Sequence, residues 1–515
     1  MTKKKRNLYD KLNTLLFGKD LRVTEGDPYT EVREYDFSSY YPVENYIKKQ
    51  AIPEKNIYNI NDYGADTAKA DNAPFINVAM DAASKNGGTV LITGGDYVTT
   101  TIVLKSDVTL FISDDSSIIS NKTGKGYEKH RAIVYAENCS NITITGGGKI
   151  CGNGHLFGRK PVAESNNTKP ADYIDVIEMR RDYRSQLRFA HESKYGGPVS
   201  LTNCNNITVK NIIIENSAYW TFKLSNCNKI NISDFVINNN RNTANADGID
   251  LAGSSNISIN HCFISTADDG IVIKNAIWLG NTAPMSNITI TDCEIISRTN
   301  AIKVGTETTY DISNISINNC RLFMTDLYPG SVSGISLEAC DGTKLSDINI
   351  KNITMDRCTC PVFIRLGNRN RAAEVNTQSA NAIEFGAKAK KGGETDKHLF
   401  DGASEIKNIR ISDMKADGVE LPIIIAGYKQ NHKIKRVKNV TLENIVLNYA
   451  DIPETVDKRL FIPEYVTVYP ECWRFRNLPA YALWIRHAEN ITIKEFTCNH
   501  PLPTWKKETI KIDCI

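Results

Sequence analysis

The chain has 515 residues, of which 41% are hydrophobic and 23% are charged, so it holds enough apolar material for a large core. Sixty-two Lys and Arg against fifty-nine Asp and Glu leave a net charge of +3, which gives no electrostatic case for binding nucleic acid or an anionic membrane. No apolar stretch approaches the ~20 residues that span a bilayer, and no CxxC pair or Cys/His cluster has zinc-ligand spacing. The sequence therefore predicts no membrane span and no metal site.

The N-terminal residues 1–55 lack the repeat that follows and are rich in charge and Tyr. We interpret them as an arm that contacts a partner, a second copy of the chain being one candidate. The start of the chain is basic but has no sustained apolar region, and its thirteen cysteines are an odd number. We expect a reduced, cytoplasmic protein, or a secreted one if a signal has been removed.

A helix is expected at residues 72–86. Pro74 stands near its start, several apolar residues follow at helical spacing, and Gly87 comes directly after it. We predict that this helix caps the N-terminal end of the main domain.

A recurring segment of the type Asn-Ile-Thr-Ile sets the fold of residues 56–500. Its copies begin at Asn141, Asn206, Lys229, Asn256, Asn287, Asn314, Asp347, Asn408, Asn439 and Asn490. In the regular part they recur every 23 to 33 residues, which suits one coil per copy. Apolar residues at offsets 0, 2, 5 and 7, as in Ile257, Ile259, Cys262 and Ile264, form two period-2 runs joined at a corner. Stacking such coils buries a continuous core, so we predict an all-β, right-handed parallel β-helix, with residues 501–515 as a tail.

Three further features belong to this frame. The wider gap from Ile348 to Ile409 predicts one additional coil that lacks the recognisable segment. Cysteines such as Cys204 and Cys262 fall on core offsets, so we interpret them as small buried apolar residues. The Asn-rich corners are interpreted as turn and ladder residues.

Three carboxylates about one coil apart are the candidate catalytic groups. Asp247 lies in NADGID, and Asp268 and Asp269 lie in TADDGIVIK. Because adjacent strands lie about 4.8 Å apart, this spacing would stack the three carboxylates in one patch. Consecutive strand residues point to opposite faces, so we expect a corner or bulge at Gly270. Crowded carboxylates push their pKa values apart, as glycoside hydrolysis requires, whereas solvated turn residues are the competing interpretation of the spacing alone.

Taken together and in order, the stretch 59–112 and the motifs GGGKICGNG, NSAYW, NADGID and TADDGIVIK resemble glycoside hydrolase family 28, the polygalacturonases and rhamnogalacturonan hydrolases. The resemblance spans residues 57–500 and implies an inverting β-helix hydrolase with no metal cofactor. It implies that Asp268 protonates the leaving oxygen, while Asp247 and Asp269 position and deprotonate the attacking water. Asn245 and Lys274 fall on the family's Asn-Thr-Asp motif and on the lysine after the Asp pair, which implies places in the substrate site.

Two departures from the family pattern bear on the substrate. Polygalacturonases carry Gly-His-Gly where this chain has Thr299, Asn300 and Ala301, so the histidine is missing, and Asn300 remains a candidate substrate-binding residue. The family's Arg-Ile-Lys motif, which implies a galacturonate carboxylate site, aligns with the segment that ends at Glu338. A carboxylate there would repel a uronate, so either the sugar is neutral or cations from elsewhere dominate.

The candidate cations are Lys303, Arg365, Arg369 and Arg371, because guanidinium groups suit carboxylates in two-pronged contacts. A solvated loop is the competing interpretation of the arginines. The role of Glu338 stays open between a fourth catalytic carboxylate and a residue that accepts sugar hydroxyls.

Aromatic and charged residues gather near the C-terminus, namely Tyr469, Glu471, Trp473, Tyr481, Trp484 and His487. If exposed, they would make a sugar-stacking wall that closes one end of a groove and favours exo-action. The competing interpretation is a packed capping segment.

We therefore expect an exo-acting glycoside hydrolase, without cofactor, for α-linked pectin-type glycosides in galacturonide or rhamnogalacturonan oligosaccharides. One alternative is a polysaccharide lyase on uronate glycans, which shares the β-helix but needs a base and usually Ca²⁺ held by carboxylates. The other is a non-catalytic carbohydrate-binding solenoid. The three retained aspartates argue against that alternative.

Overall fold

The computed structural model describes residues 42–121, 123–154, 197–241, 243, 245–325, 331–369, 402–450, 462–475, 478–500 and 506–515, with the backbone of 159–161 and 189–191. From Val43 onward these residues belong to one compact unit, whereas residues 1–41 of the predicted arm and Arg371 lie outside the described residues. Within the described ranges, no helix is long and apolar enough to cross a membrane.

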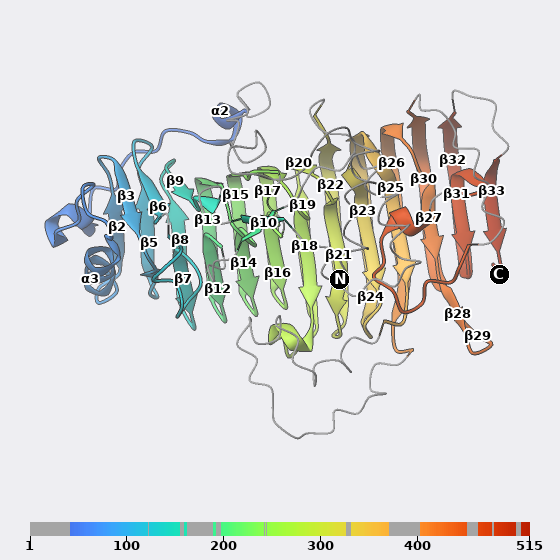
Figure 1. Ribbon diagram of the computed structural model, residues 1–515, viewed down its shortest axis with the longest axis horizontal. Helices are drawn as coiled ribbons and strands as arrows, with labels where there is room; N and C mark the ends of the chain where they lie inside the picture. Colours follow the sequence, from blue (N-terminus) through green and yellow to red (C-terminus); the bar gives the residue numbers. More distant parts are fainter. Residues whose placement is uncertain are drawn as a thin grey trace, which may run out of the picture. The chain divides into compact units, whose positions relative to one another are not determined.

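Two long parallel sheets form the walls of this unit (Figure 1). The 17-stranded sheet contains β1 (Ile57–Asn59), β2 (Gly88–Ile92), β3 (Asp96–Thr99), β5 (Val108–Ile112), β6 (Ser117–Ser120), β8 (Ser140–Thr145), β9 (Lys149–Cys151), β13 (Asn205–Glu215), β15 (Asn228–Asn238), β17 (Ser255–Thr266), β19 (Met285–Thr291), β20 (Glu294–Ser297), β22 (Ile312–Phe323), β24 (Lys344–Asp356), β26 (Glu405–Val419), β30 (Val437–Tyr449) and β32 (Ala488–Asn499). The 12-stranded sheet contains β4 (Ile102–Val103), β7 (Val134–Glu137), β12 (Val199–Thr202), β14 (Phe222–Ser225), β16 (Ile249–Ala252), β18 (Ile271–Asn275), β21 (Asn300–Thr308), β23 (Ser331–Ala339), β25 (Cys358–Leu366), β27 (Ile423–Ala426), β31 (Ala480–Arg486) and β33 (Lys507–Ile512).

The remaining elements are short. Two antiparallel pairs join β10 (Arg159–Pro161) to β11 (Phe189–His191) and β28 (Tyr428–Gln430) to β29 (Lys433–Lys435). The helices are α2 (Val43–Tyr46), α3 (Ala73–Ala83) and the short 3₁₀ helices η2 (Ile60–Tyr63), η4 (Ile277–Leu279) and η6 (Cys472–Phe475). Helix α3 confirms the expected helix at residues 72–86, and it lies at the end of the stack that holds β2 and β3 (Figure 1).

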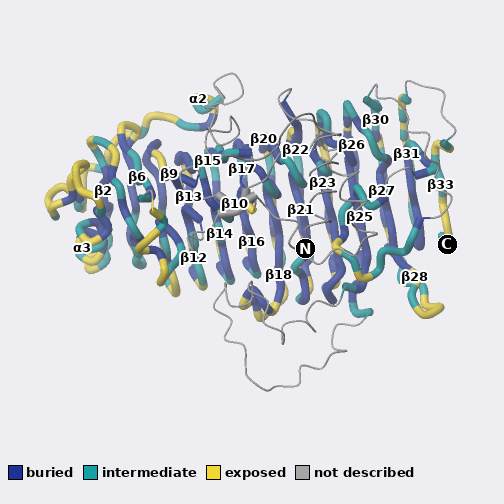
Figure 2. The backbone as a smooth tube through the Cα atoms, in the orientation of Figure 1, coloured by how far each residue is buried: buried dark blue, intermediate teal, exposed yellow. Residues whose placement is uncertain are grey.

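The frame isoleucines stack from coil to coil and fill the interior. Ile207 pairs with Ile230, which pairs with Ile257, and the same row continues through Ile288 and Ile315. All are buried in one continuous core, which Figure 2 shows as dark blue strands along the stack. Each coil covers the apolar edge of the next, so the predicted right-handed parallel β-helix is confirmed.

The first residue of each copy has a specific backbone role. Asn206, Asn256 and Asn287 have φ near +55 to +60°, the left-handed region that Asn tolerates better than most residues. Their side-chain amides also form a ladder, because Asn287 donates to Asn256 and Asn314 donates to Asn287, each at 2.7 Å. The interpretation of these asparagines as turn and ladder residues is confirmed.

Two details differ from the sequence-based expectation. Ile348 pairs directly with Ile409, so the prediction of a hidden coil between them is wrong, and the extra residues are an insertion within one coil. Residues 507–512, expected to be part of a tail, form β33 and pair with β31. The cysteines behave as expected, since Cys204 and Cys262 are buried in the core and all thirteen are free thiols.

Candidate active site

Strand alternation places a polar row on the outer face of the 12-stranded sheet. Each of the four neighbouring strands β16, β18, β21 and β23 points one isoleucine into the core. These are Ile249, Ile271, Ile302 and Ile335. The next residues along each strand therefore point outward, and they are Asp250, Val272, Lys303 and Ser336. Asp250 and Lys303 are nevertheless almost completely buried, so their charges must be paired within the protein.

Asp268 and Asp269 lie in the corner between two strands, as expected from the sequence. β17 ends at Thr266 and β18 begins at Ile271, so the two carboxylates are not bound to opposite faces of one strand. A Cβ atom on Gly270 would lie 2.5 Å from the backbone oxygen of Ala301, in the next coil. Gly270 therefore permits the close stacking of this corner on its neighbour.

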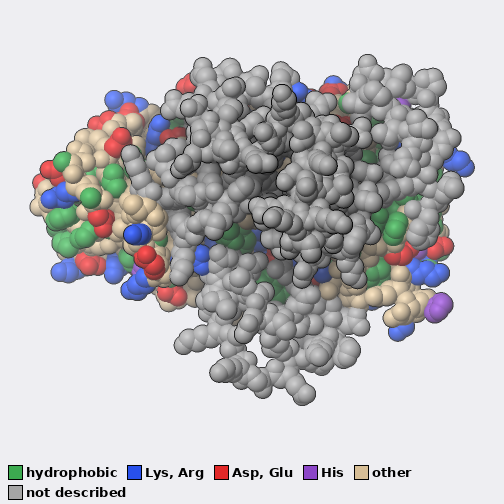
Figure 3. Space-filling model, in the orientation of Figure 1, with side chains coloured by type: hydrophobic (Ala, Val, Ile, Leu, Met, Phe, Trp, Pro, Cys, Tyr) green, Lys and Arg blue, Asp and Glu red, His purple; other side chains and the backbone are tan. Residues whose placement is uncertain are grey.

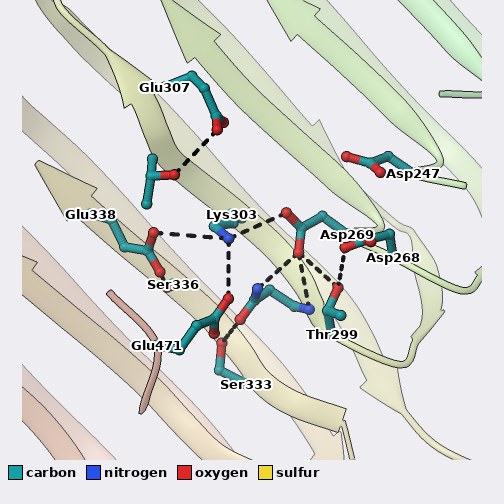
Figure 4. A network of polar contacts seen from close by, with 12 residues as sticks. Asp247, Asp268, Asp269, Thr299, Lys303, Glu307, Ser333, Ser336, Glu338 and Glu471 are labelled. Atoms are coloured by element: carbon teal, nitrogen blue, oxygen red, sulfur yellow. Dashed lines mark hydrogen bonds and ion pairs between the residues drawn. The ribbon is translucent and has the colours of Figure 1, made fainter. Parts of the chain in front are cut away.

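Asp269 is held by a ring of hydrogen-bond donors. Its Oδ1 accepts from the Thr299 hydroxyl at 2.8 Å, from the Asn300 side-chain amide at 2.8 Å and from the Asn300 backbone N–H at 3.3 Å. The Ser333 hydroxyl donates to the Asn300 amide oxygen at 2.5 Å, which fixes the orientation of that amide. Lys303 Nζ lies 3.4 Å from the other oxygen, Oδ2 (Figure 4). Both oxygens of Asp269 therefore face hydrogen-bond donors or a positive charge.

Asp268 is half-buried and is contacted by backbone donors. The backbone N–H groups of Asn245 and Asp269 donate to its two oxygens at 3.2 and 3.1 Å. Thr299 Oγ1 lies 3.1 Å from Asp268 Oδ1, so this one hydroxyl contacts both carboxyl groups. A hydroxyl carries a single proton, so the two contacts are either one three-centre hydrogen bond shared by both carboxylates or, when one aspartate is protonated, two separate hydrogen bonds.

Asp247 shares a buried lysine with Asp250. Lys274 Nζ lies 3.3 Å from Asp247 Oδ2 and 2.8 Å from Asp250 Oδ1, and it also stands 3.6 Å from the centre of the Trp220 ring. Burial raises the pKa of Asp247 well above its usual value; Lys274 opposes the shift, and the negative charges of Asp250, Asp268 and Asp269 add to it. Burial likewise raises the pKa of Asp250 to about 6.

A second buried lysine lies among three carboxylates. Lys303 Nζ is 3.4 Å from Asp269, 3.5 Å from Glu471 Oε1 and 3.9 Å from Glu338 Oε2 (Figure 4). It also contacts the Tyr469 hydroxyl at 3.2 Å. Burial raises the pKa of Glu338 to about 8, against the opposing effect of Lys303. The two lysines thus divide the site into two parts. The Asp247 side contains Asp247, Asp250 and Lys274, and the Glu338 side contains Lys303, Glu338 and Glu471, with Asp269 in contact with Lys303.

The two predicted arginines have other partners. The Arg365 guanidinium is buried and donates to the backbone oxygens of Gly427, at 2.7 Å, and Tyr465, at 3.0 Å, so it ties neighbouring segments together. Arg369 forms a two-pronged ion pair with the buried Asp341, one contact being 3.0 Å from Nε to Oδ1. These partners are backbone oxygens and Asp341, not Asp247, Asp268 or Asp269, and binding of substrate by the two arginines stays a prediction.

The other predicted substrate residues divide by location. Lys274, Asn300, Lys303 and Glu338 all lie at the site, although Lys274 and Asn300 are engaged by the candidate catalytic carboxylates Asp247 and Asp269. Asn245 is exposed and reaches the site through its backbone N–H. Direct contact of these residues with a sugar stays a prediction.

The C-terminal aromatic segment separates into packed and open parts. Trp484 and His487 are buried, as the capping interpretation requires. Tyr469 remains 39% exposed above Lys303. Phe475 of η6 packs on Phe363 of β25, and this contact anchors the segment that carries Tyr469 to the sheet.

Several site residues were not singled out from the sequence. Asp250 stands three positions after Asp247 on an outward strand position, a signal that strand alternation could have revealed. Thr299 stands where the family pattern has the first Gly of Gly-His-Gly, which gives no signal of a contact with the aspartates, and Ser333 has no signal. Among the described residues, no group of three or more His, Cys, Asp and Glu has a geometry that could hold a metal ion. Around the N-terminal coils the visible surface mixes charges of both signs (Figure 3).

Known proteins resemble the chain in both sequence and fold. Residues 88–386 match the model of the glycosyl hydrolases family 28. The polygalacturonase QRT2 of Arabidopsis thaliana is 24% identical over 60% of this chain and 64% of its own length, so the chain covers slightly less than two thirds of that relative. An exopolygalacturonase structure from Thermotoga maritima has a TM-score of 0.60 at 17% identity, covering 89% of this chain and 94% of that one. A family 28 exopolygalacturonase from Yersinia enterocolitica has a TM-score of 0.57 at 16% identity, covering 90% and 78%.

Proposed function

Because the chain belongs to the glycosyl hydrolases family 28, we propose that it hydrolyses α-linked glycosides of the pectin type, from galacturonide or rhamnogalacturonan oligosaccharides. The observation that carries the proposal is the contact of one hydroxyl, that of Thr299, with both Asp268 and Asp269. Glycoside hydrolysis by inversion needs one protonated carboxyl group and one ionised carboxylate that activates water. The proposal assigns these two roles to the two aspartates that Thr299 contacts.

Asp268 is the general acid in this proposal. Asp269 accepts hydrogen bonds from both nitrogens of Asn300 and lies beside Lys303, so its two oxygens already face donors. In this proposal Thr299 donates its proton to Asp269, and Asp268 donates its own proton to the Thr299 oxygen. Asp268 thereby holds a proton that it can transfer to the leaving glycosidic oxygen.

Asp269 and Asp247 position and deprotonate the attacking water. Lys274 holds Asp247 against movement through its contacts with Asp247 and Asp250. Burial of Asp247 raises its pKa, and a carboxylate that is a stronger base takes a proton from water more readily. Asp250 acts on the reaction only through Lys274, so it is a positioning residue.

We also propose exo-action on short chains. The segment that carries Tyr469 and Glu471 packs on the 12-stranded sheet and brings both side chains onto Lys303. Such a wall beside the catalytic carboxylates favours binding of a chain end over the middle of a polymer.

The test is a product screen by mass spectrometry with oligogalacturonides, rhamnogalacturonan oligosaccharides and neutral α-glycosides. We expect the wild-type protein to release a monosaccharide, and the Asp268→Asn variant to lose at least about 100-fold in kcat because the proton donor is gone. Glu405→Gln, an exposed substitution on the other sheet, is the matched control. Wild-type turnover in the Asp268→Asn variant would refute the assignment, and unsaturated products would indicate a lyase.

A further inference from the structure

The Glu338 side of the site carries more negative than positive charge. Asp269, Glu338 and Glu471 all lie within 4 Å of one ammonium group, that of Lys303. The Glu338 and Lys303 side chains are 0% and 2% exposed, so solvent does little to screen them. One positive charge cannot neutralise three carboxylates at once.

Two carboxylate oxygens in this cluster have no hydrogen bond. Glu338 Oε1 accepts from the Ser336 hydroxyl at 2.6 Å, but the buried Glu338 Oε2 accepts no hydrogen bond and has only the ion-pair contact with Lys303 at 3.9 Å. Glu471 Oε2 is also buried without a hydrogen-bond partner. In Figure 4, both glutamates point toward Lys303 from separate segments. Buried polar atoms are rarely left unpaired, so these oxygens indicate that a hydrogen-bond donor is bound here.

No other described cation is placed to reverse the charge. Arg365 is engaged with backbone oxygens, and Arg369 is paired with Asp341. The carboxylate of Glu307 is a further negative charge, and it helps to raise the pKa of the Tyr469 hydroxyl. A carboxylate of a ligand would therefore meet like charge, whereas a hydroxyl would meet free acceptors.

We propose that Glu338 and Glu471 bind sugar hydroxyls and select a neutral sugar at the position beside Asp269, where they exclude a uronate. Lys303 donates to an oxygen of the same sugar, and the exposed ring of Tyr469 offers an apolar surface to its C–H face. This inference rests on the proposed function and narrows its substrate class. An oligosaccharide that presents a neutral residue at this position fits the site, and a chain of uronates alone does not.

The burial of Glu338 supports the same conclusion. Its pKa is raised to about 8, first by burial, with the negative charges of Glu471 and Asp269 adding to the shift that Lys303 opposes. A uronate carboxylate in the same place would experience the same burial and the same negative neighbours. It would either carry a proton or be excluded.

The experiment compares two forms of one substrate, an oligogalacturonide and the same oligosaccharide after reduction of its carboxyl groups to primary alcohols. The two forms share every linkage and differ only in charge at C6. For the wild-type protein we expect kcat/KM to be higher for the neutral form by on the order of tenfold or more. Glu471→Gln should move this ratio toward the uronate by on the order of tenfold, and Glu338→Gln should do so above a pH of about 8, where Glu338 is ionised, while Glu405→Gln leaves it unchanged.

Binding measurements separate this inference from the proposed function. Titration calorimetry of both forms on the Asp268→Asn variant gives the same preference as a ratio of Kd values, without any turnover. Tighter binding of the uronate form, or a ratio that neither Glu338→Gln nor Glu471→Gln moves, overturns the inference. A clear binding preference for the neutral form without hydrolysis by the wild-type protein supports the inference and overturns the proposed function.

Discussion

Replacement of Glu338 by Gln should change how the stability of the protein depends on pH. Burial raises the pKa of Glu338 to about 8 in the folded protein, whereas an unfolded chain gives glutamic acid a pKa of ~4.3. Between these values the folded protein keeps a proton that the unfolded chain has lost. The folded state therefore binds more protons, and the free energy of unfolding falls as pH rises.

The size of this effect follows from the proton count. One extra proton in the folded state gives a slope of about −1.4 kcal/mol per pH unit, which sums to about 3 kcal/mol between pH 5.5 and 7.5. The stabilising contribution is fully present below the unfolded pKa and is lost as pH rises through the folded pKa, above which the slope flattens. Glu471 is buried beside the same lysine and its pKa is also raised, so it contributes to the pH dependence of the free energy of unfolding. The part of this dependence that belongs to Glu338 alone is therefore smaller.

The assay is equilibrium unfolding in denaturant at pH 5.5, 6.5 and 7.5, for the wild-type protein and for Glu338→Gln. We expect the free energy of unfolding of the wild type to fall more steeply with pH than that of the variant. The exposed Glu405→Gln change is the control and should keep the wild-type slope. Parallel pH dependence of the wild type and Glu338→Gln would refute the argument that Glu338 is protonated in the folded protein.

Two further substitutions test the arrangement of the site. Lys303→Met should lower the free energy of unfolding by about 3–5 kcal/mol, because it leaves buried carboxylates without their shared cation, and adding Glu471→Gln should recover part of that loss in denaturant unfolding. If the double variant is less stable than Lys303→Met, the excess of negative charge is not the cause. Thr299→Val removes the hydroxyl that contacts Asp268 and Asp269 at nearly constant volume, and steady-state kinetics should show kcat reduced by on the order of tenfold or more with a smaller change in KM. An unchanged kcat would contradict the proton assignment.

The fold could be predicted because its cause is local and repeated. The frame isoleucine and the Asn before it recur in each coil, and the left-handed φ of residues such as Asn256 and Asn287 explains why Asn is used there. The prediction of an additional coil between Ile348 and Ile409 was wrong because it rested on the number of residues between them. An insertion in a loop and a coil with a weak repeat pattern have the same length in the sequence. Only the strand pairing distinguishes the two.

The catalytic triplet could be located because one coil of sequence separates residues that are neighbours in space. The same reasoning reaches Lys274 and Lys303, which lie on adjacent strands of the sheet. It does not reach Glu471, which comes from a segment far along the chain and meets Lys303 only through tertiary packing. For Arg365 the sequence suggested a site residue, since a guanidinium suits a uronate. In the structure this group donates to backbone oxygens, which no sequence pattern predicts.

The two buried lysines explain how so many carboxylates coexist on one face. Lys274 lies between Asp247 and Asp250 and contacts both, although Asp250 Oδ2 is also buried without a hydrogen-bond partner. Lys303 meets three carboxylates and leaves Glu338 Oε2 and Glu471 Oε2 without hydrogen-bond donors. The first lysine thus serves the reaction, whereas the incomplete compensation around the second is what a hydroxyl-bearing ligand would complete. Chemistry and sugar selection are in this way assigned to neighbouring strands of the same sheet, with Asp269 and its contact to Lys303 as the link between them.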